Sequence, residues 1–91
     1  MASIPQPVVR YFAAVTDGVV IGARTSSRNL THAVVLARPG AQAFATFHTS
    51  REDAEFSASH HYKAPVYSKR VVETIVTATR LNVGDRYEVV G

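Results

Sequence analysis

The stretch VVRYFAAVTDGVVI, residues 8–21, carries the clearest structural signal in the chain. Along residues 8–15 the side chains alternate between two faces, as they do in a β-strand. Asp17-Gly18 follows, and another β-rich run begins at Val19. Asp-Gly between two such runs indicates a two-residue hairpin turn, because both central positions of that turn need a positive φ. The sequence therefore predicts an antiparallel hairpin and a fold built on a β-sheet.

Two more β-rich runs follow this hairpin. Residues 31–38 and 42–48 are separated by Pro39-Gly40, a pair typical of a turn, since Pro fixes a negative φ and Gly allows a positive one. The polar residues 25–29, TSSRN, are interpreted as a hairpin connection, because Ser and Asn favour turns. Four consecutive runs joined by short turns predict an antiparallel meander.

A helix is predicted after the fourth run. Residues 49–52, TSRE, have the form of a capping box. In this motif the Thr49 hydroxyl accepts a hydrogen bond from a free helix amide while Glu52 reaches back. We expect the helix to cover residues 50–62 and to end before Pro65, because proline cannot continue a helix.

Residues 68–80, SKRVVETIVTATR, fit two structures. Their apolar side chains form a helical stripe, yet seven of the thirteen residues are β-branched and favour a strand. We favour a strand, and expect a short last strand over residues 86–90 beside it. The complete expectation is an α+β fold, with an antiparallel sheet of five to six strands that begins as a β-meander and one main helix packed on one face. Residues 1–91 are expected to form a single domain, with residues 1–7 as an extended lead-in because proline cannot donate to a sheet.

Composition limits the classes of function. A chain of 91 residues builds one small domain with a thin core. The absence of cysteine excludes disulfides and thiolate chemistry, and it favours a reducing compartment. The sequence shows neither a signal peptide nor a membrane span, so we expect a cytoplasmic protein. The net charge of +3 permits an acidic partner but does not form the dense patch of a dedicated nucleic-acid binder.

Three motifs together suggest an origin. RTSSRNLTHAVV covers residues 24–35, FHTSRED covers residues 47–53, and VVETIV covers residues 71–76. In this pattern the chain resembles a group of small uncharacterised accessory proteins encoded by bacteriophages of actinobacteria. The resemblance implies a phage accessory protein that acts in the cytoplasm of a host bacterium, and it supports a strand over residues 69–78. It implies no catalytic or binding residue.

Catalysis and metal binding have little support in the sequence. The chain has no cysteine nucleophile, and its serines lack the flanking residues of a nucleophile elbow. His48 and the pair His60-His61 do not have the spacing of a metal-ligand set. We therefore expect a non-enzymatic protein without a cofactor or a metal.

The favoured function is binding to other proteins. The β-rich runs carry apolar residues on both faces, whereas one helix covers only one face of a sheet. The uncovered face predicts a homo-oligomer, unless residues 66–81 are helical and cover it. The phage resemblance adds a host protein as a partner. The candidate interface residues are Phe12, Val34, Leu36 and Phe44.

The alternative function is binding of nucleic acid or a nucleotide. Arg24, Ser26, Arg28 and Arg38 are candidates for an anion site, in which guanidinium and hydroxyl groups meet a phosphate. The stretch around them has no glycine, so its backbone cannot form a Walker-type cradle. A plain polar connection between two strands explains the same residues, because surface loops are ordinarily polar.

Overall fold

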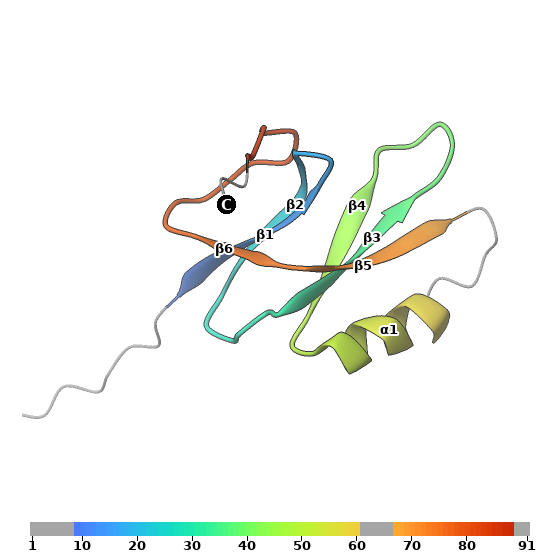
Figure 1. The fold of residues 1–91 in the computed structure, drawn as a ribbon, viewed down its shortest axis with the longest axis horizontal. Helices are drawn as coiled ribbons and strands as arrows, with labels where there is room; N and C mark the ends of the chain where they lie inside the picture. Colours follow the sequence, from blue (N-terminus) through green and yellow to red (C-terminus); the bar gives the residue numbers. More distant parts are fainter. Residues whose placement is uncertain (1–8, 61–66, 89–91) are drawn as a thin grey trace, which may run out of the picture.

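The computed structural model describes residues 9–60 and 67–88, and this part of the chain contains six strands and one helix (Figure 1). The α+β class is therefore confirmed. The predicted lead-in over residues 1–7 lies outside the described residues. The elements, in chain order, are β1 (Arg10–Thr16), β2 (Val19–Ser26), β3 (His32–Ala37), β4 (Phe44–His48), α1 (Arg51–His60), β5 (Ser68–Glu73) and β6 (Ile75–Thr77).

The strands form two antiparallel sheets and not one. The first sheet has the order β2-β1-β6, and the second has the order β4-β3-β5. The two hairpins β1–β2 and β3–β4 are confirmed, but β2 does not pair with β3, so the single sheet and the four-strand meander are wrong. The polar connection after β2 is not a hairpin turn. It carries the chain from the first sheet to the second (Figure 1).

Both predicted turns have the expected backbone. Asp17 and Gly18 have φ values of 53° and 74°, as a two-residue turn of the predicted type requires. Gly40 has a φ of 76°, and the Ala41 amide donates to the Arg38 carbonyl at 3.4 Å. A β-bulge between Ala14 and Val15 shifts the register of the first hairpin and adds to its twist.

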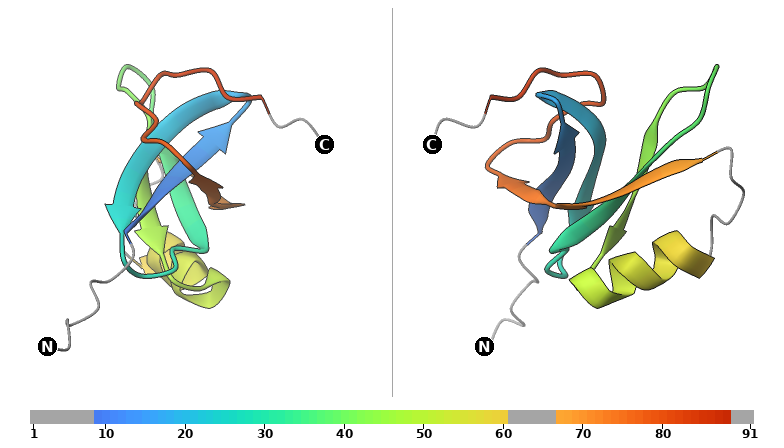
Figure 2. Two further views of the ribbon diagram at one scale, coloured as in Figure 1. Left: turned by 90° about the vertical axis from the view of Figure 1, so that its left-hand side faces the viewer. Right: turned by 45° about the vertical axis from the view of Figure 1, so that its right-hand side comes forward.

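Strand β3 lies at the centre of the structure, because side chains on both of its faces are buried. Ala33 and Val35 pack with Ala14 of β1, whereas Val34 and Leu36 pack with Ala54 of α1. The second sheet therefore lies between the first sheet and the helix, as Figure 2 shows from two sides. From the sequence, we expected the single helix to leave the opposite face of the sheet uncovered. In the structure the first sheet covers that face, so this premise was wrong.

Residues 68–77 are extended, which confirms the strand interpretation for this part of the ambiguous segment. β5 pairs with β3 and β6 pairs with β1, and Thr74 alone separates them. One extended stretch therefore supplies an outer strand to each sheet. The Thr74 amide donates to the Thr31 carbonyl at 3.0 Å, which holds the crossing point against the start of β3.

Residues 89–90 of the predicted last strand over residues 86–90 lie outside the described residues, and within the described part this strand is represented by a single bridge between Val19 and Arg86. This bridge pairs the segment with the start of β2, whereas the sequence predicted pairing with residues 68–80. The Val20 amide donates to the Asp85 carbonyl at 2.9 Å, and the Gly84 amide donates to the Val20 carbonyl at 2.8 Å. These bonds occupy the outer edge of β2 near the hairpin turn.

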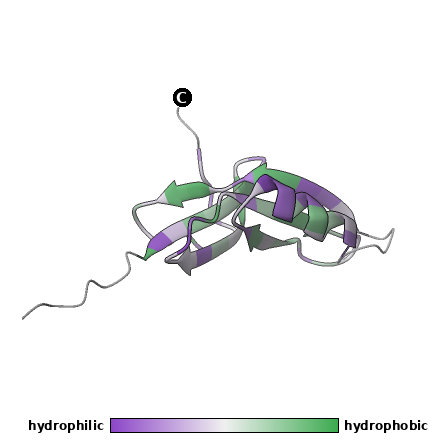
Figure 3. Cartoon of the chain, turned by 90° about the horizontal axis from the view of Figure 1, so that it is seen from below, coloured by the Kyte–Doolittle hydropathy of each residue, from purple (hydrophilic) through white to green (hydrophobic). Residues whose placement is uncertain are grey.

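Helix α1 begins one residue later than predicted. The Ser50 hydroxyl, and not that of Thr49, accepts a hydrogen bond from the Asp53 amide at 3.1 Å. The predicted continuation to residue 62 lies outside the described residues. Ala54 is buried against the second sheet, while Phe56 is 54% exposed. Seen from below in Figure 3, the helix is coloured mainly as hydrophilic.

A close contact between the two sheets gives a first prediction. A Cβ atom added at Gly22 of β2 would lie 2.9 Å from the Cβ of Ala45 in β4. Gly22→Ala should therefore lower the free energy of unfolding by about 1–3 kcal/mol. Adding Ala45→Gly should recover part of this loss, because it removes the clashing methyl group. Urea unfolding of both single variants and the double variant measures the coupling, and strictly additive losses would contradict this packing.

The position of the helix cap gives a second prediction. Ser50→Ala should lower the free energy of unfolding by about 1 kcal/mol, because the Asp53 amide loses its acceptor. Thr49→Ala, the matched control, should change it by less than about 0.5 kcal/mol. Thermal unfolding of the two variants measures the difference. A larger loss of unfolding free energy for Thr49→Ala than for Ser50→Ala would contradict the Ser50 cap and favour Thr49 as the cap, as the sequence predicted.

Candidate functional site

Three of the four predicted interface residues lie inside the molecule. Phe12 is 1% exposed, and Val34 and Leu36 are fully buried. Val34 and Leu36 pack beneath α1. These side chains therefore stabilise the core and are not available to a partner, which corrects the prediction for them. Phe44 is 38% exposed, and its ring meets that of Tyr67 edge-on with 6.4 Å between the centroids.

The predicted anion-site residues lie in two separate places in the structure. Arg24, Ser26 and Arg28 line one hollow at the end of β2. Arg38 lies just after the far end of β3, where its guanidinium carbon is 5.9 Å from the centre of the Tyr67 ring. The structure therefore brings together three of the four residues, and Arg38 belongs to a different surface.

We call this hollow the arginine groove, and it has a volume of about 300 Å³. One wall comes from β2 and the connection that follows it, and is formed by Arg24, Ser26, Ser27, Arg28 and Leu30. The other wall comes from the end of β4 and the start of α1, and is formed by Phe47, His48, Thr49 and Asp53.

The alternation of β2 explains why its polar residues face the groove. Side chains two apart in a strand share a face, so Gly22, Arg24 and Ser26 point the same way. A Cβ at Gly22 would meet Ala45 and the Phe47 ring, so this face is turned toward β4. At position 22, where β2 contacts β4, a side chain would clash with Ala45. Further along β2 the same face carries Arg24 and Ser26 and borders the open groove.

The connection after β2 is held at several points. The Ser26 hydroxyl accepts a hydrogen bond from the Arg28 amide at 3.0 Å, which closes a tight local turn. Leu30 is 5% exposed and anchors the connection in the core. The Thr74 hydroxyl donates to the Leu30 carbonyl. The backbone that carries Arg28 is therefore fixed at both ends.

His48 connects β4 to α1 within the second wall through its two ring nitrogens. Its Nδ1 lies 2.8 Å from Asp53 Oδ2, and its Nε2 lies 2.8 Å from Thr46 Oγ1. A carboxylate can only accept, so Nδ1 carries the proton, and in the neutral ring Nε2 accepts from the Thr46 hydroxyl. The side chain of His48 is only 12% exposed. Because both nitrogens have partners, His48 is better suited to fixing Asp53 than to acting as a general base.

The charges of the groove are unequal. Two guanidinium groups face one carboxylate, and that carboxylate is bonded to His48. Among the described residues, the ion pairs are His48–Asp53 and Arg51–Glu55, so neither Arg24 nor Arg28 has a carboxylate within 4.0 Å. Arginine forks without a carboxylate partner are suited to binding an anion from solution.

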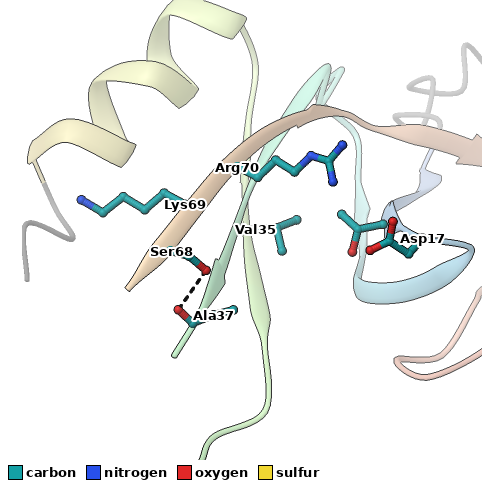
Figure 4. Close-up of a pocket in the computed structure, with 7 residues that line it drawn as sticks. Asp17, Val35, Ala37, Ser68, Lys69 and Arg70 are labelled. Carbon is teal, nitrogen blue, oxygen red and sulfur yellow. Dashed lines mark hydrogen bonds between the residues drawn. The ribbon is translucent and has the colours of Figure 1, made fainter. Parts of the chain in front are cut away.

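A second hollow of about 270 Å³ lies beside the β1–β2 turn (Figure 4). Lys69 and Arg70 point to opposite sides of β5, so Arg70 alone faces the side of Asp17. Val35 and Ala37 contribute to the apolar part of its lining. Lys69 also lines the hollow, but Arg70 is the cation that points toward Asp17 and can be neutralised by it. This hollow is therefore the weaker candidate for an anion.

Sequence reasoning identified one wall of the groove and missed the other. His48, Thr49 and Asp53 lie twenty or more residues from Arg24 and Arg28, and they line the same groove because the sheets stack. In the described residues, no three His, Asp or Glu side chains gather as a metal site would require. No helix there is long and apolar enough to cross a membrane.

Comparisons with known proteins found no matching family model, no similar curated protein and no similar solved structure. They do not bear on the resemblance to phage accessory proteins, which stays a prediction.

The link between Thr74 and the connection after β2 can be tested. Thr74→Val removes the donor to the Leu30 carbonyl, so it should cost about 1 kcal/mol of folding free energy. It should also shift the amide resonances of residues 27–31. Thr77→Val is the control, because the Thr77 hydroxyl makes an exposed bond to the Thr79 carbonyl. Equal effects of the two variants on these resonances would contradict the proposed anchoring.

Proposed function

We propose that this protein is a non-enzymatic binding protein whose arginine groove holds a phosphate-bearing ligand. The observation that supports the proposal is that Arg24 and Arg28 line one groove without a carboxylate partner among the described residues. The phage resemblance would place this activity in the cytoplasm of a host bacterium.

The chemistry of the first wall suits a phosphate group. Guanidinium forks donate paired hydrogen bonds to phosphate oxygens, and these charged bonds are roughly twice as strong as neutral ones. Ser26 and Ser27 add hydroxyl groups to the same wall, and Thr49 adds one from the opposite wall. The connection is held by Leu30 and Thr74, so little ordering is needed when a ligand binds.

The size of the groove favours a small ligand over an extended nucleic acid. A volume of about 300 Å³ is at the lower end of the range for small-molecule sites. Arg38 lies on another surface, so two arginines and not three converge. A protein that neutralises two phosphates of a single strand would show a shallow salt dependence, with a slope of about −1.4 in the plot of log affinity against log salt.

Protein binding, to a second copy of the chain or to a host protein, stays a prediction. Three of its four candidate interface residues, Phe12, Val34 and Leu36, are buried within the chain. We therefore place anion binding first.

Titration calorimetry with inorganic phosphate, adenosine monophosphate and a single-stranded oligonucleotide tests the proposal. Arg24→Gln and Arg28→Gln should each weaken binding by about tenfold or more, because each removes charged hydrogen bonds. Arg80→Gln makes the same charge change at an exposed position that does not line the groove, so it should leave the affinity unchanged.

Two results would contradict the proposal. One is the absence of binding by all three compounds at millimolar concentration. The other is an equal loss in all three variants, which would indicate general attraction to a positive protein and not a site.

A further inference from the structure

The arginine groove also presents a hydrogen-bond acceptor. Asp53 lines the wall opposite Arg24 and Arg28, and its side chain is 59% exposed. Its Oδ2 accepts from His48, whereas among the described residues its Oδ1 accepts no hydrogen bond. An ionised carboxylate has room for further donors on that second oxygen.

Asp53 has local roles, and these do not use its second oxygen. It stands in the first turn of α1, where the helix dipole favours a negative charge. Its backbone amide donates to the Ser50 cap, and Oδ2 meets the histidine. Asp53 also lines a neighbouring hollow with Ser50, Glu52 and Phe56, but it is the only carboxylate residue among those that line the arginine groove in the described part of the chain. Its Oδ1 is therefore the carboxylate oxygen available to a ligand in the groove.

A carboxylate at this position opposes a ligand that is only anionic. Like charges at close range repel, and repeated phosphates along a strand would bring further negative charge to the Asp53 side. A ligand with an anionic group at one end and a strong N–H donor at the other would instead match both walls. Charge complementarity of this kind selects among ligands as well as binding them.

We propose, on the basis of the proposed function, that the groove binds a small phosphorylated amine. Its phosphate lies against Arg24 and Arg28, and its ammonium group donates to Oδ1 of Asp53. His48 positions Asp53 by holding Oδ2, so that the second oxygen is presented to the ligand. Asp53 is then the residue that determines specificity.

A matched pair of ligands tests this. Phosphoethanolamine and ethyl phosphate have similar size, and differ in the terminal ammonium group. Wild-type protein should bind phosphoethanolamine about tenfold more tightly, since one charged hydrogen bond is gained. Asp53→Asn should abolish this preference and should not weaken ethyl phosphate, because the opposing charge is removed.

Glu52→Gln is the matched control variant. It removes one negative charge from the same turn of α1, but Glu52 lines a neighbouring hollow and not the groove. It should keep the preference for phosphoethanolamine. A comparable loss in Glu52→Gln would overturn the assignment to Asp53. Far-UV circular dichroism checks that each variant is folded, and the wild-type preference stands as a test without any variant.

The two proposals fail in different ways. If both ligands bind equally to the wild type and both depend on Arg24 and Arg28, the phosphate site stands and the amine inference is wrong. If neither ligand binds and the nucleotide does not bind either, the proposed function itself is wrong.

Vesicles containing phosphatidylethanolamine test whether the ligand is a lipid head group or a free compound. Vesicle binding that is lost in Arg28→Gln would identify the head group as the source of the same chemistry. Binding of the free compound without vesicle binding would identify a solute. In both cases loss of the preference in Asp53→Asn is required.

Discussion

The structure depends on the burial of strand β3 from both sides. Ala33 and Val35 need cover on one face, and Val34 and Leu36 need it on the other. Neither a single sheet nor a helix alone can supply both covers, because each packs against one face of its neighbour. The first sheet covers one face of β3 and α1 covers the other.

The groove follows from the way the sheets are stacked. β2 contacts β4 closely at Gly22, where no side chain fits, and the same strand face then carries Arg24 and Ser26 beyond this contact. The end of β4 leads directly into α1 and places His48 and Asp53 opposite. A close contact and an open groove are therefore successive parts of one strand face. Arg24, Ser26 and Arg28 therefore form one wall of a site only because His48 and Asp53 line the other.

Local signals in the sequence were sufficient for local structure. The hairpin at Asp17-Gly18 was predicted because those two residues tolerate a positive φ. The strand over residues 68–80 was predicted because β-branched side chains favour extended backbone, and residues 68–73 and 75–77 are strands. The division into two sheets was not predicted, because it depends on which strands pair across long separations. For the same reason Arg24, Ser26 and Arg28 were identified, whereas His48 and Asp53 were not connected to them.

The shared stretch β5–β6 has a consequence for the order of assembly. During synthesis the hairpins β1–β2 and β3–β4 leave the ribosome complete, and each can form from contacts close in sequence. The third strand of both sheets arrives only with residues 68–77. Until then each hairpin presents an unpaired edge to its surroundings, and such edges invite wrong partners. A single late segment then covers the free edge of β1 and the free edge of β3, and its continuous backbone joins the two sheets.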